Sequence, residues 1–230
     1  MKSIRLDSVS RVFGRTFALH RVTMDFEAGL ITGLAGDNGA GKTTLLNILA
    51  TLDSPTDGQI HFGRHDFEEF ARRGRHKIGW VSHDSLVYPE LTGRENLLFF
   101  ADMYGLEERE RRADQWLERV GLAEAADRRV SAYSRGMTQR LTLARALVHD
   151  PFVVLLDEPM TGLDRQGRRD MRALLEQLRD EGRLIVLVSH DLGLLDQLAD
   201  AVAILRRGKL AHLTPAEATT ELFEAYEAHA

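Results

Sequence analysis

Nine consecutive residues early in the chain have the types and spacing of a loop that holds phosphate groups. They are Gly36, Asp37, Asn38, Gly39, Ala40, Gly41, Lys42, Thr43 and Thr44. Glycines let successive backbone N–H groups turn toward phosphate oxygens, and a helix that begins there adds a positive partial charge. Lys42 would contact the outer phosphates and assist catalysis, and the Thr43 hydroxyl would bind Mg²⁺. We therefore predict a nucleotide-binding loop rather than a chance glycine turn.

Two carboxylates follow an apolar run in the second half of the chain. Residues 152–156 are Phe, Val, Val, Leu and Leu, and Asp157 and Glu158 come next. A buried strand of this kind ends at the edge of the sheet where the phosphate loop also lies. Asp157 can hold Mg²⁺ directly or through water, while Glu158 can orient and deprotonate an attacking water. The alternative is that both residues merely end the strand.

The elements around these residues are typical of an α/β fold. Residues 30–35 form a strand that enters the glycine-rich turn, and a helix follows over about residues 42–51. The apolar runs 152–156 and 184–188 are separated by a helical pattern, which predicts two parallel, centrally buried strands joined by a helix.

A helical region interrupts the sheet pattern. From about residue 91 to residue 149 the apolar residues recur at helical spacing. We interpret residues 1–230 as one domain, whose core is 1–90 and 150–230 and whose inserted helical lobe is 91–149.

Composition narrows the class of protein. Apolar residues make up 43% of the chain, cysteine is absent, and 30 basic and 35 acidic residues give a net charge of −5. We expect a globular protein of a reducing compartment, the cytoplasm, that does not bind nucleic acid, because no basic footprint is present. The longest apolar runs are far shorter than a membrane span, so a membrane role requires another polypeptide.

A phosphate loop alone also occurs in kinases, GTPases and recombinases, and a further motif separates these classes. Tyr133, Ser134, Arg135, Gly136 and Met137 form a segment that resembles the Leu-Ser-Gly-Gly-Gln signature of ABC ATPases. As in that family, the segment begins a helix that precedes the strand with the two carboxylates.

Two more segments extend this resemblance over nearly the whole chain. Residues 161–164, which end in Asp164, resemble the D-loop of ABC ATPases, and His190 resembles their switch histidine. The family implies a P-loop, RecA-like and mostly parallel sheet, with antiparallel strands at the N-terminus and an inserted helical lobe. It also implies ATP and Mg²⁺ as cofactors, with Glu158, His190 and Lys42 in catalysis.

The resemblance further implies partners. In ABC ATPases the signature faces the γ-phosphate bound by another subunit, so residues 134–137 would act in trans in a head-to-tail homodimer or in a heterodimer with a paralogous ATPase subunit. A separate transmembrane permease would be driven from the cytoplasmic face of the membrane. The alternative is a soluble ABC ATPase that remodels a cytosolic complex.

One further position resembles the family pattern, and two depart from it. Phe13 resembles the aromatic residue that stacks on adenine, although it could also pack in a small sheet. At the junction where the family usually has glutamine stand His83 and Asp84; Asp84 is a hard oxygen donor for Mg²⁺, whereas histidine suits softer metals. Arg135 replaces a signature glycine, either adding charge or facing solvent. Residues 81–83, 88–97 and 133–137 together resemble the heme-exporter ATPases of cytochrome c maturation.

Overall fold

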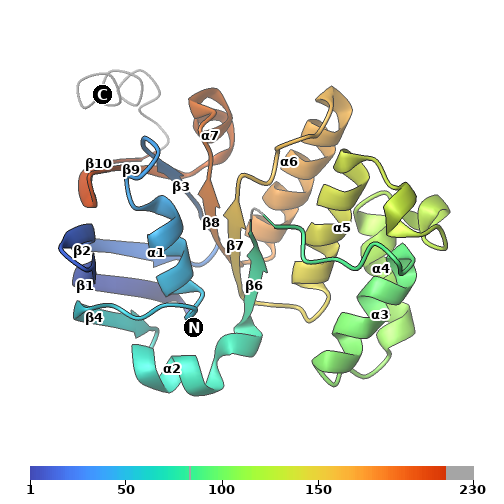
Figure 1. Cartoon of the computed structure of the whole chain (residues 1–230), viewed down its shortest axis with the longest axis horizontal. Coiled ribbons are helices and arrows are strands. Elements are labelled where there is room, and N and C mark those ends of the chain that lie inside the picture. Colours follow the sequence, from blue (N-terminus) through green and yellow to red (C-terminus); the bar gives the residue numbers. More distant parts are fainter. Residues whose placement is uncertain (83, 216–230) are drawn as a thin grey trace.

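The computed structural model describes residues 1–82 and 84–215, which form two sheets and a group of helices at one end (Figure 1). The smaller sheet is antiparallel, with the strand order β2-β1-β4-β5. Its strands are β1 Ser3–Phe13, β2 Thr16–Glu27, β4 Asp57–Phe62 and β5 His65–Asp66.

The larger sheet has the strand order β10-β9-β3-β8-β7-β6. Its strands are β3 Ile31–Ala35, β6 Ile78–Val81, β7 Val153–Asp157, β8 Leu184–Val188, β9 Ala201–Arg206 and β10 Lys209–Pro215. Neighbouring strands are parallel except for the β9–β10 hairpin. The prediction of two central parallel strands is confirmed, since β8 lies between β3 and β7, and β7 lies between β8 and β6.

The helices cover the sheets and build a lobe at one end of the molecule. They are α1 Lys42–Leu49, α2 Phe67–Arg73, α3 Gly93–Met103, α4 Arg109–Arg119, α5 Arg135–Leu147, α6 Arg165–Asp180 and α7 Leu192–Leu198. Short 3₁₀ turns occupy Arg75–Lys77, Ala123–Ala125 and Val130–Ala132. Helix α1 lies beside the smaller sheet, and α3, α4 and α5 form the lobe at the opposite end (Figure 1). In this part of the chain no helix is long and apolar enough to cross a membrane.

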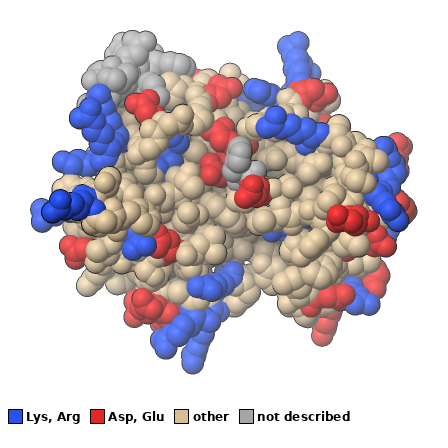
Figure 2. All heavy atoms as spheres, in the orientation of Figure 1, with Lys and Arg blue, Asp and Glu red and all other residues tan. Residues whose placement is uncertain are grey.

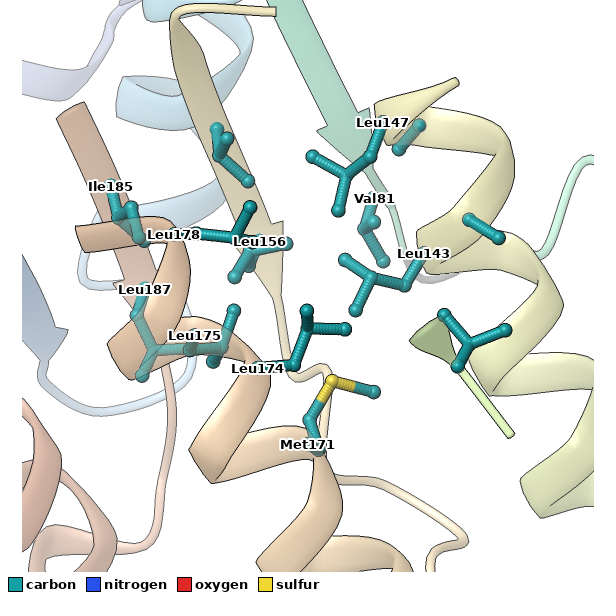
Figure 3. Packing of buried hydrophobic residues seen from close by; sticks show 14 of the residues in the cluster. Val81, Leu143, Leu147, Leu156, Met171, Leu174, Leu175, Leu178, Ile185 and Leu187 are labelled. Carbon is teal, nitrogen blue, oxygen red and sulfur yellow. The ribbon is translucent and has the colours of Figure 1, made fainter. Parts of the chain in front are cut away.

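Apolar side chains from both faces of the larger sheet form two cores. On β7, Val153 and Leu155 pack toward α1 and the smaller sheet, whereas Val154 and Leu156 pack toward α5 and α6. Figure 3 shows the second of these layers, in which Leu174 of α6 and Leu143 of α5 approach Leu156. Burial on both faces explains why the sequence of β7 is a continuous apolar run instead of an alternating one.

The fold predicted from the sequence is confirmed, and the two-sheet arrangement with a helical lobe is the one expected. The division into a core of 1–90 and 150–230 and a lobe of 91–149 stays a prediction. Strands β1 and β6 and helices α2 and α7 were not predicted from the sequence.

Strand β6 lies at the edge of the larger sheet, and side chains from α5 and the residues after it bind its outward carbonyls. Arg145 donates from Nη2 to the Trp80 carbonyl (2.7 Å), and His149 Nε2 lies 3.0 Å from the Ile78 carbonyl oxygen. The His149 ring also stacks on Tyr104, with 3.9 Å between ring centroids. Burial lowers the pKa of His149 from 6.5 to about 4. These contacts join the lobe to the strand that leads toward residues 82–84.

We expect the neutral state of His149 to make the stability of the protein depend on pH. Unfolded, this histidine takes up a proton as the pH falls below about 6.5, whereas the folded form stays neutral to about pH 4. The free energy of unfolding should therefore be highest above pH 6.5 and fall by up to about 3 kcal/mol toward pH 4. Urea unfolding of the wild type and of His149→Gln, which keeps a donor for the Ile78 carbonyl, measures this. Equal pH dependence in both proteins would contradict the assignment.

Candidate functional site

The phosphate loop connects the end of β3 to the start of α1. Its lysine, Lys42, is 6% exposed and donates from Nζ to the carbonyl oxygens of Gly36 (2.5 Å) and Asp37 (2.9 Å). Burial lowers the pKa of Lys42, and the nearby Glu158 and Asp157 carboxylates oppose that shift. The ammonium group is thus held inside the loop, beside the end of β7.

Two glycines of the loop leave no room for a side chain. Gly36 and Gly41 have φ angles of 142° and 106°. A Cβ atom on Gly36 would clash with the Leu205 carbonyl oxygen of β9, and one on Gly41 would clash with the Ala18 carbonyl oxygen of β2. Gly39 also has a positive φ of 79°, but no atom lies within 4 Å of the position of its Cβ. The loop therefore packs directly on the backbone of two neighbouring strands.

The carboxylates at the end of β7 lie beside the end of β8. Asp157 pairs in register with Val188, and Glu158 follows it with a φ of 51°, a left-handed conformation that is rare for such a residue. Glu158 Oε1 accepts a hydrogen bond from the backbone N–H of His190 (2.8 Å), and the His190 Nε2 atom lies 3.7 Å from the same oxygen. The turn after β7 thus directs Glu158 toward His190.

Burial raises the pKa of Glu158, and the neighbouring His190, its backbone N–H and Lys42 partly oppose the shift. A carboxylate with a raised pKa is a stronger base once it is deprotonated. On the face drawn in Figure 2, acidic side chains gather near the carboxyl ends of β6 and β7. The predicted base follows the end of β7 and contacts His190, which follows the end of β8.

A hollow of about 350 Å³ brings several of the predicted residues together. Its walls include residues 38–44 of the phosphate loop, Asp157 and His190, and Phe13 from the end of β1. Thr16, Phe17 and Ala18 from the start of β2 complete its rim. Residues that are far apart in the sequence thus surround one space beside the Lys42 side chain.

The hollow also fits Mg²⁺. Thr43 and Asp157 both border it and supply hard oxygen donors, a hydroxyl and a carboxylate. Within residues 1–82 and 84–215 no cluster of three or more His, Cys, Asp or Glu side chains could hold a metal by itself. Mg²⁺ commonly binds through one or two protein ligands together with phosphate oxygens, so this donor set suits an ion that arrives with a nucleotide.

The signature segment borders a different space. Ser134 is the N-cap of α5, and its hydroxyl accepts a hydrogen bond from the Met137 N–H (3.3 Å). Ser134, Arg135, Gly136 and Met137 line a hollow of about 470 Å³ together with Gly162 and Asp164. Asp164 is the N-cap of α6 and accepts from the Gly167 N–H (2.8 Å). Lys42 does not line this hollow, so Ser134 and Lys42 of one chain border different spaces.

Arg135 lies across the D-loop. The stem of its side chain packs where a Cβ of Gly162 would be, and the residue borders both the signature hollow and a hollow of about 390 Å³. That second space is lined by Asp84, Asp157 and Glu158. Asp84 thus comes close to the predicted catalytic carboxylates. The other predicted junction residue, His83, lies outside the described residues.

Sequence reasoning missed two groups beside the nucleotide hollow. Phe17 is half exposed and contacts the His20 ring edge to face, with 4.6 Å between centroids. Arg11 lies over the Phe13 ring, with its guanidinium carbon 4.5 Å from the centroid. The only sequence signal for either was a second aromatic residue in the same hairpin as Phe13.

A phosphate loop between a buried strand and a helix, with carboxylates at the end of a parallel strand, defines a P-loop nucleotide-binding protein. A family profile described as "ABC transporter" matches residues 19–161. The chain belongs to this family, and it is an ATP-binding, ATP-hydrolysing subunit that energises an ABC transporter.

Relatives and solved structures agree with this assignment. The chain is 35% identical over 196 residues to the ABC transporter ATP-binding protein NatA of Bacillus subtilis, covering 84% of this chain and 80% of NatA. It is 31% identical to the linearmycin resistance ATP-binding protein LnrL of the same organism, covering 90% of this chain and 67% of LnrL. An ATP-binding cassette solved as a dimer in a post-hydrolysis state with ADP and Pi has a TM-score of 0.83, 27% identity, and coverage of 93% of this chain and 98% of that chain.

The crowding of Gly41 yields a prediction with a matched control. Alanine at either Gly39 or Gly41 must adopt a left-handed φ, which costs about 1–2 kcal/mol. Only Gly41→Ala also meets a backbone oxygen, that of Ala18. We expect Gly41→Ala to lose affinity for a fluorescent ATP analogue at least tenfold, whereas Gly39→Ala keeps most of it. Equal losses in the two variants would show that the packing against β2 does not shape the loop.

Proposed function

We propose that this chain hydrolyses ATP as one half of a head-to-tail dimer and that the dimer drives a separate transmembrane permease. One observation carries the dimer proposal: the signature hollow at Ser134 and the nucleotide hollow at Lys42 are different spaces on one chain. A complete site then needs the phosphate loop of one protomer and the signature of another. The dimeric post-hydrolysis structure of a related cassette supports this arrangement.

Within each site we assign the phosphates to the backbone of residues 36–44 and to Lys42. Thr43 and Asp157 would hold Mg²⁺, with the phosphate oxygens as further ligands. Phe13 would stack on the adenine. Glu158 would take a proton from the attacking water, and His190, which contacts it, would hold the γ-phosphate end of the site. Asp84 is the oxygen donor at the junction that is best supported by position, because it shares a hollow with Glu158.

The other half of each site would come from the N-terminus of α5. The backbone N–H groups after Ser134 and the positive end of the helix form a second anion-binding position. The γ-phosphate would bridge the two protomers, and its loss on hydrolysis would open the dimer. The same geometry serves a homodimer or a heterodimer with a paralogous subunit.

An exposed apolar patch supports the permease as partner. Leu86, Tyr88, Phe99, Met103 and Tyr104 are all exposed, and the ring centroids of Tyr88 and Phe99 are 5.1 Å apart. The patch lies where Tyr88 packs on α3, and Ser82, Asp84 and Ser85, which precede it in the chain, border the hollow of the catalytic carboxylates. Apolar surface of this kind is typical of an interaction site. A permease helix bound here would hold the subunit at the cytoplasmic face of the membrane.

The competing role is that of a soluble ABC ATPase that remodels a cytosolic complex. Capture of the tagged full-length chain from native membranes separates the two. Recovery of the chain with a protein that has about six apolar stretches of about 20 residues supports the transporter role. If Met103→Glu no longer captures that protein, the apolar patch is supported as its binding site. Recovery with cytosolic proteins alone would contradict it.

The narrower heme-exporter resemblance stays a proposal that rests on residues 81–83, 88–97 and 133–137 of the sequence. The relatives described above are not named for heme, and one is named for linearmycin resistance. The ATPase activity of the complex with the permease tests this assignment. Stimulation by heme and not by lipophilic antibiotics would support it.

Replacing the proposed base separates binding from chemistry. Glu158→Gln should bind ATP normally and hydrolyse it 10²- to 10⁴-fold more slowly, a loss of about 3–5 kcal/mol of transition-state stabilisation. Because the pKa of Glu158 is raised by burial, wild-type turnover should fall as the pH drops through a value above 4.5. Single-turnover assays test both expectations, with the exposed Glu124→Gln as the control. A normal rate of hydrolysis by Glu158→Gln would show that Glu158 is not the general base.

Blocking the signature tests whether the second protomer is needed. A bulky cation in Ser134→Arg should leave ATP binding to a monomer unchanged but abolish ATP-dependent dimers and turnover, since Ser134 does not line the nucleotide hollow of its own chain. Size-exclusion chromatography with ATP, in the Glu158→Gln background, measures dimerisation. A normal turnover rate in Ser134→Arg would contradict the role in trans.

A further inference from the structure

The aromatic platform of the nucleotide hollow has a cation on one of its two faces. Phe13 ends β1 and is 51% exposed, and it borders the hollow beside the phosphate loop. Arg11 lies two positions earlier on the same strand, so both side chains stand on the same face of the sheet. Its guanidinium carbon is 4.5 Å from the Phe13 ring centroid. A base that stacks on Phe13 must therefore use the other face of the ring.

The guanidinium of Arg11 is itself fixed by a carboxylate. Arg11 Nε donates to one oxygen of Asp53 (2.8 Å), and Nη2 lies 2.7 Å from the other. The side chains of Arg11 and Asp53 are 25% and 23% exposed, so the pair is mostly shielded from water. A two-point contact of this kind fixes the plane of the guanidinium as well as its position.

Asp53 connects this pair to the phosphate loop. It follows α1, and its backbone N–H donates to the Asn47 carbonyl (3.3 Å), while its carboxylate accepts from the Ser54 N–H (2.9 Å). Helix α1 begins at Lys42, so α1 and the turn after it connect the phosphate loop to the carboxylate that holds Arg11. The orientation of Phe13 is thus set relative to the phosphates through Arg11, Asp53 and α1.

We propose that Arg11 and Asp53 are positioning residues for the nucleobase, which hold the Phe13 ring in the orientation that stacks on adenine when the phosphates lie in the loop. The inference rests on the proposed stacking role of Phe13. An exposed phenylalanine loses side-chain freedom when a base binds, and a ring that is already held loses less. Arg11 and Asp53 therefore act on affinity for the base and leave affinity for the phosphates unchanged.

The chain offers a matched control on the same strand. Arg5 and Asp25 form an ion pair between β1 and β2 (2.9 Å), but their side chains are 67% and 45% exposed and neither borders the nucleotide hollow. Arg5→Met removes the same groups as Arg11→Met. A general effect of losing an arginine from β1 would appear in both variants.

The experiment compares ATP with inorganic tripolyphosphate, which has the phosphates but no base. Dissociation constants for the Mg²⁺ complexes are measured by competition with a fluorescent nucleotide, in the full-length Glu158→Gln protein. We expect Arg11→Met to weaken ATP binding by about three- to tenfold, the size of a partly shielded cation–π contact. Tripolyphosphate binding by Arg11→Met should change less than twofold. The affinity of Arg11→Lys for ATP should lie between those of Arg11→Met and the wild type. The affinity of Arg5→Met for ATP should match that of the wild type.

A double-mutant cycle with Phe13 separates this inference from the stacking proposal. Phe13→Leu should weaken ATP binding and leave tripolyphosphate binding unchanged. Adding Arg11→Met to this variant should then have no further effect on ATP binding. If Phe13→Leu leaves ATP binding unchanged, Phe13 does not stack on adenine, and both the stacking proposal and this inference are wrong. If Phe13→Leu weakens ATP while Arg11→Met and Arg11→Lys do not, only the inference is overturned. Equal losses for ATP and tripolyphosphate in Arg11→Met, or losses that persist in the Phe13→Leu background, also overturn it.

Discussion

The site depends on the burial of one cation. Lys42 is 6% exposed, and its burial favours the neutral form of the amine unless negative groups surround it. Two loop carbonyls and the carboxylates at the end of β7 supply that surrounding. The loop turns the carbonyls of Gly36 and Asp37 toward Lys42, with Gly36 at a φ of 142°, and the parallel strand β7 ends beside it. The phosphate loop and β7 are therefore one electrostatic unit.

The lobe is attached to this unit through α5, the helix that begins at the signature. At its N-terminus, Arg135 packs on Gly162 of the D-loop. Near its C-terminus, Arg145 and His149 bind the carbonyls of edge strand β6. Helix α5 and the residues after it therefore contact both the D-loop and edge strand β6. The exposed Tyr88 ring packs against this lobe, since it stacks on Phe100 of α3.

Local sequence patterns determined much of the site. The phosphate loop, the Asp157–Glu158 pair after an apolar strand, and Ser134 at the start of a helix each lie within one short segment. Backbone chemistry explains this, because glycine conformations, strand ends and helix caps depend on residues only a few positions apart. Two buried central strands could be predicted for a similar reason, since continuous apolar runs are required on both faces. Strand β1 was missed because its register with β2 is irregular at several positions and its polar residues obscure the alternation.

Only the tertiary structure decided which distant residues pair. Arg11 and Asp53 are 42 positions apart, and the backbone N–H of His190 reaches Glu158 across 32 positions. Such contacts depend on which strands are neighbours, on their register and on where each loop returns, and no local propensity encodes these quantities. The sequence by itself determined the chemical groups and their order along the chain. Packing of the two sheets around α1 decided which of these groups share a hollow, because burial of apolar surface, not the polar contacts, sets the positions of the strands.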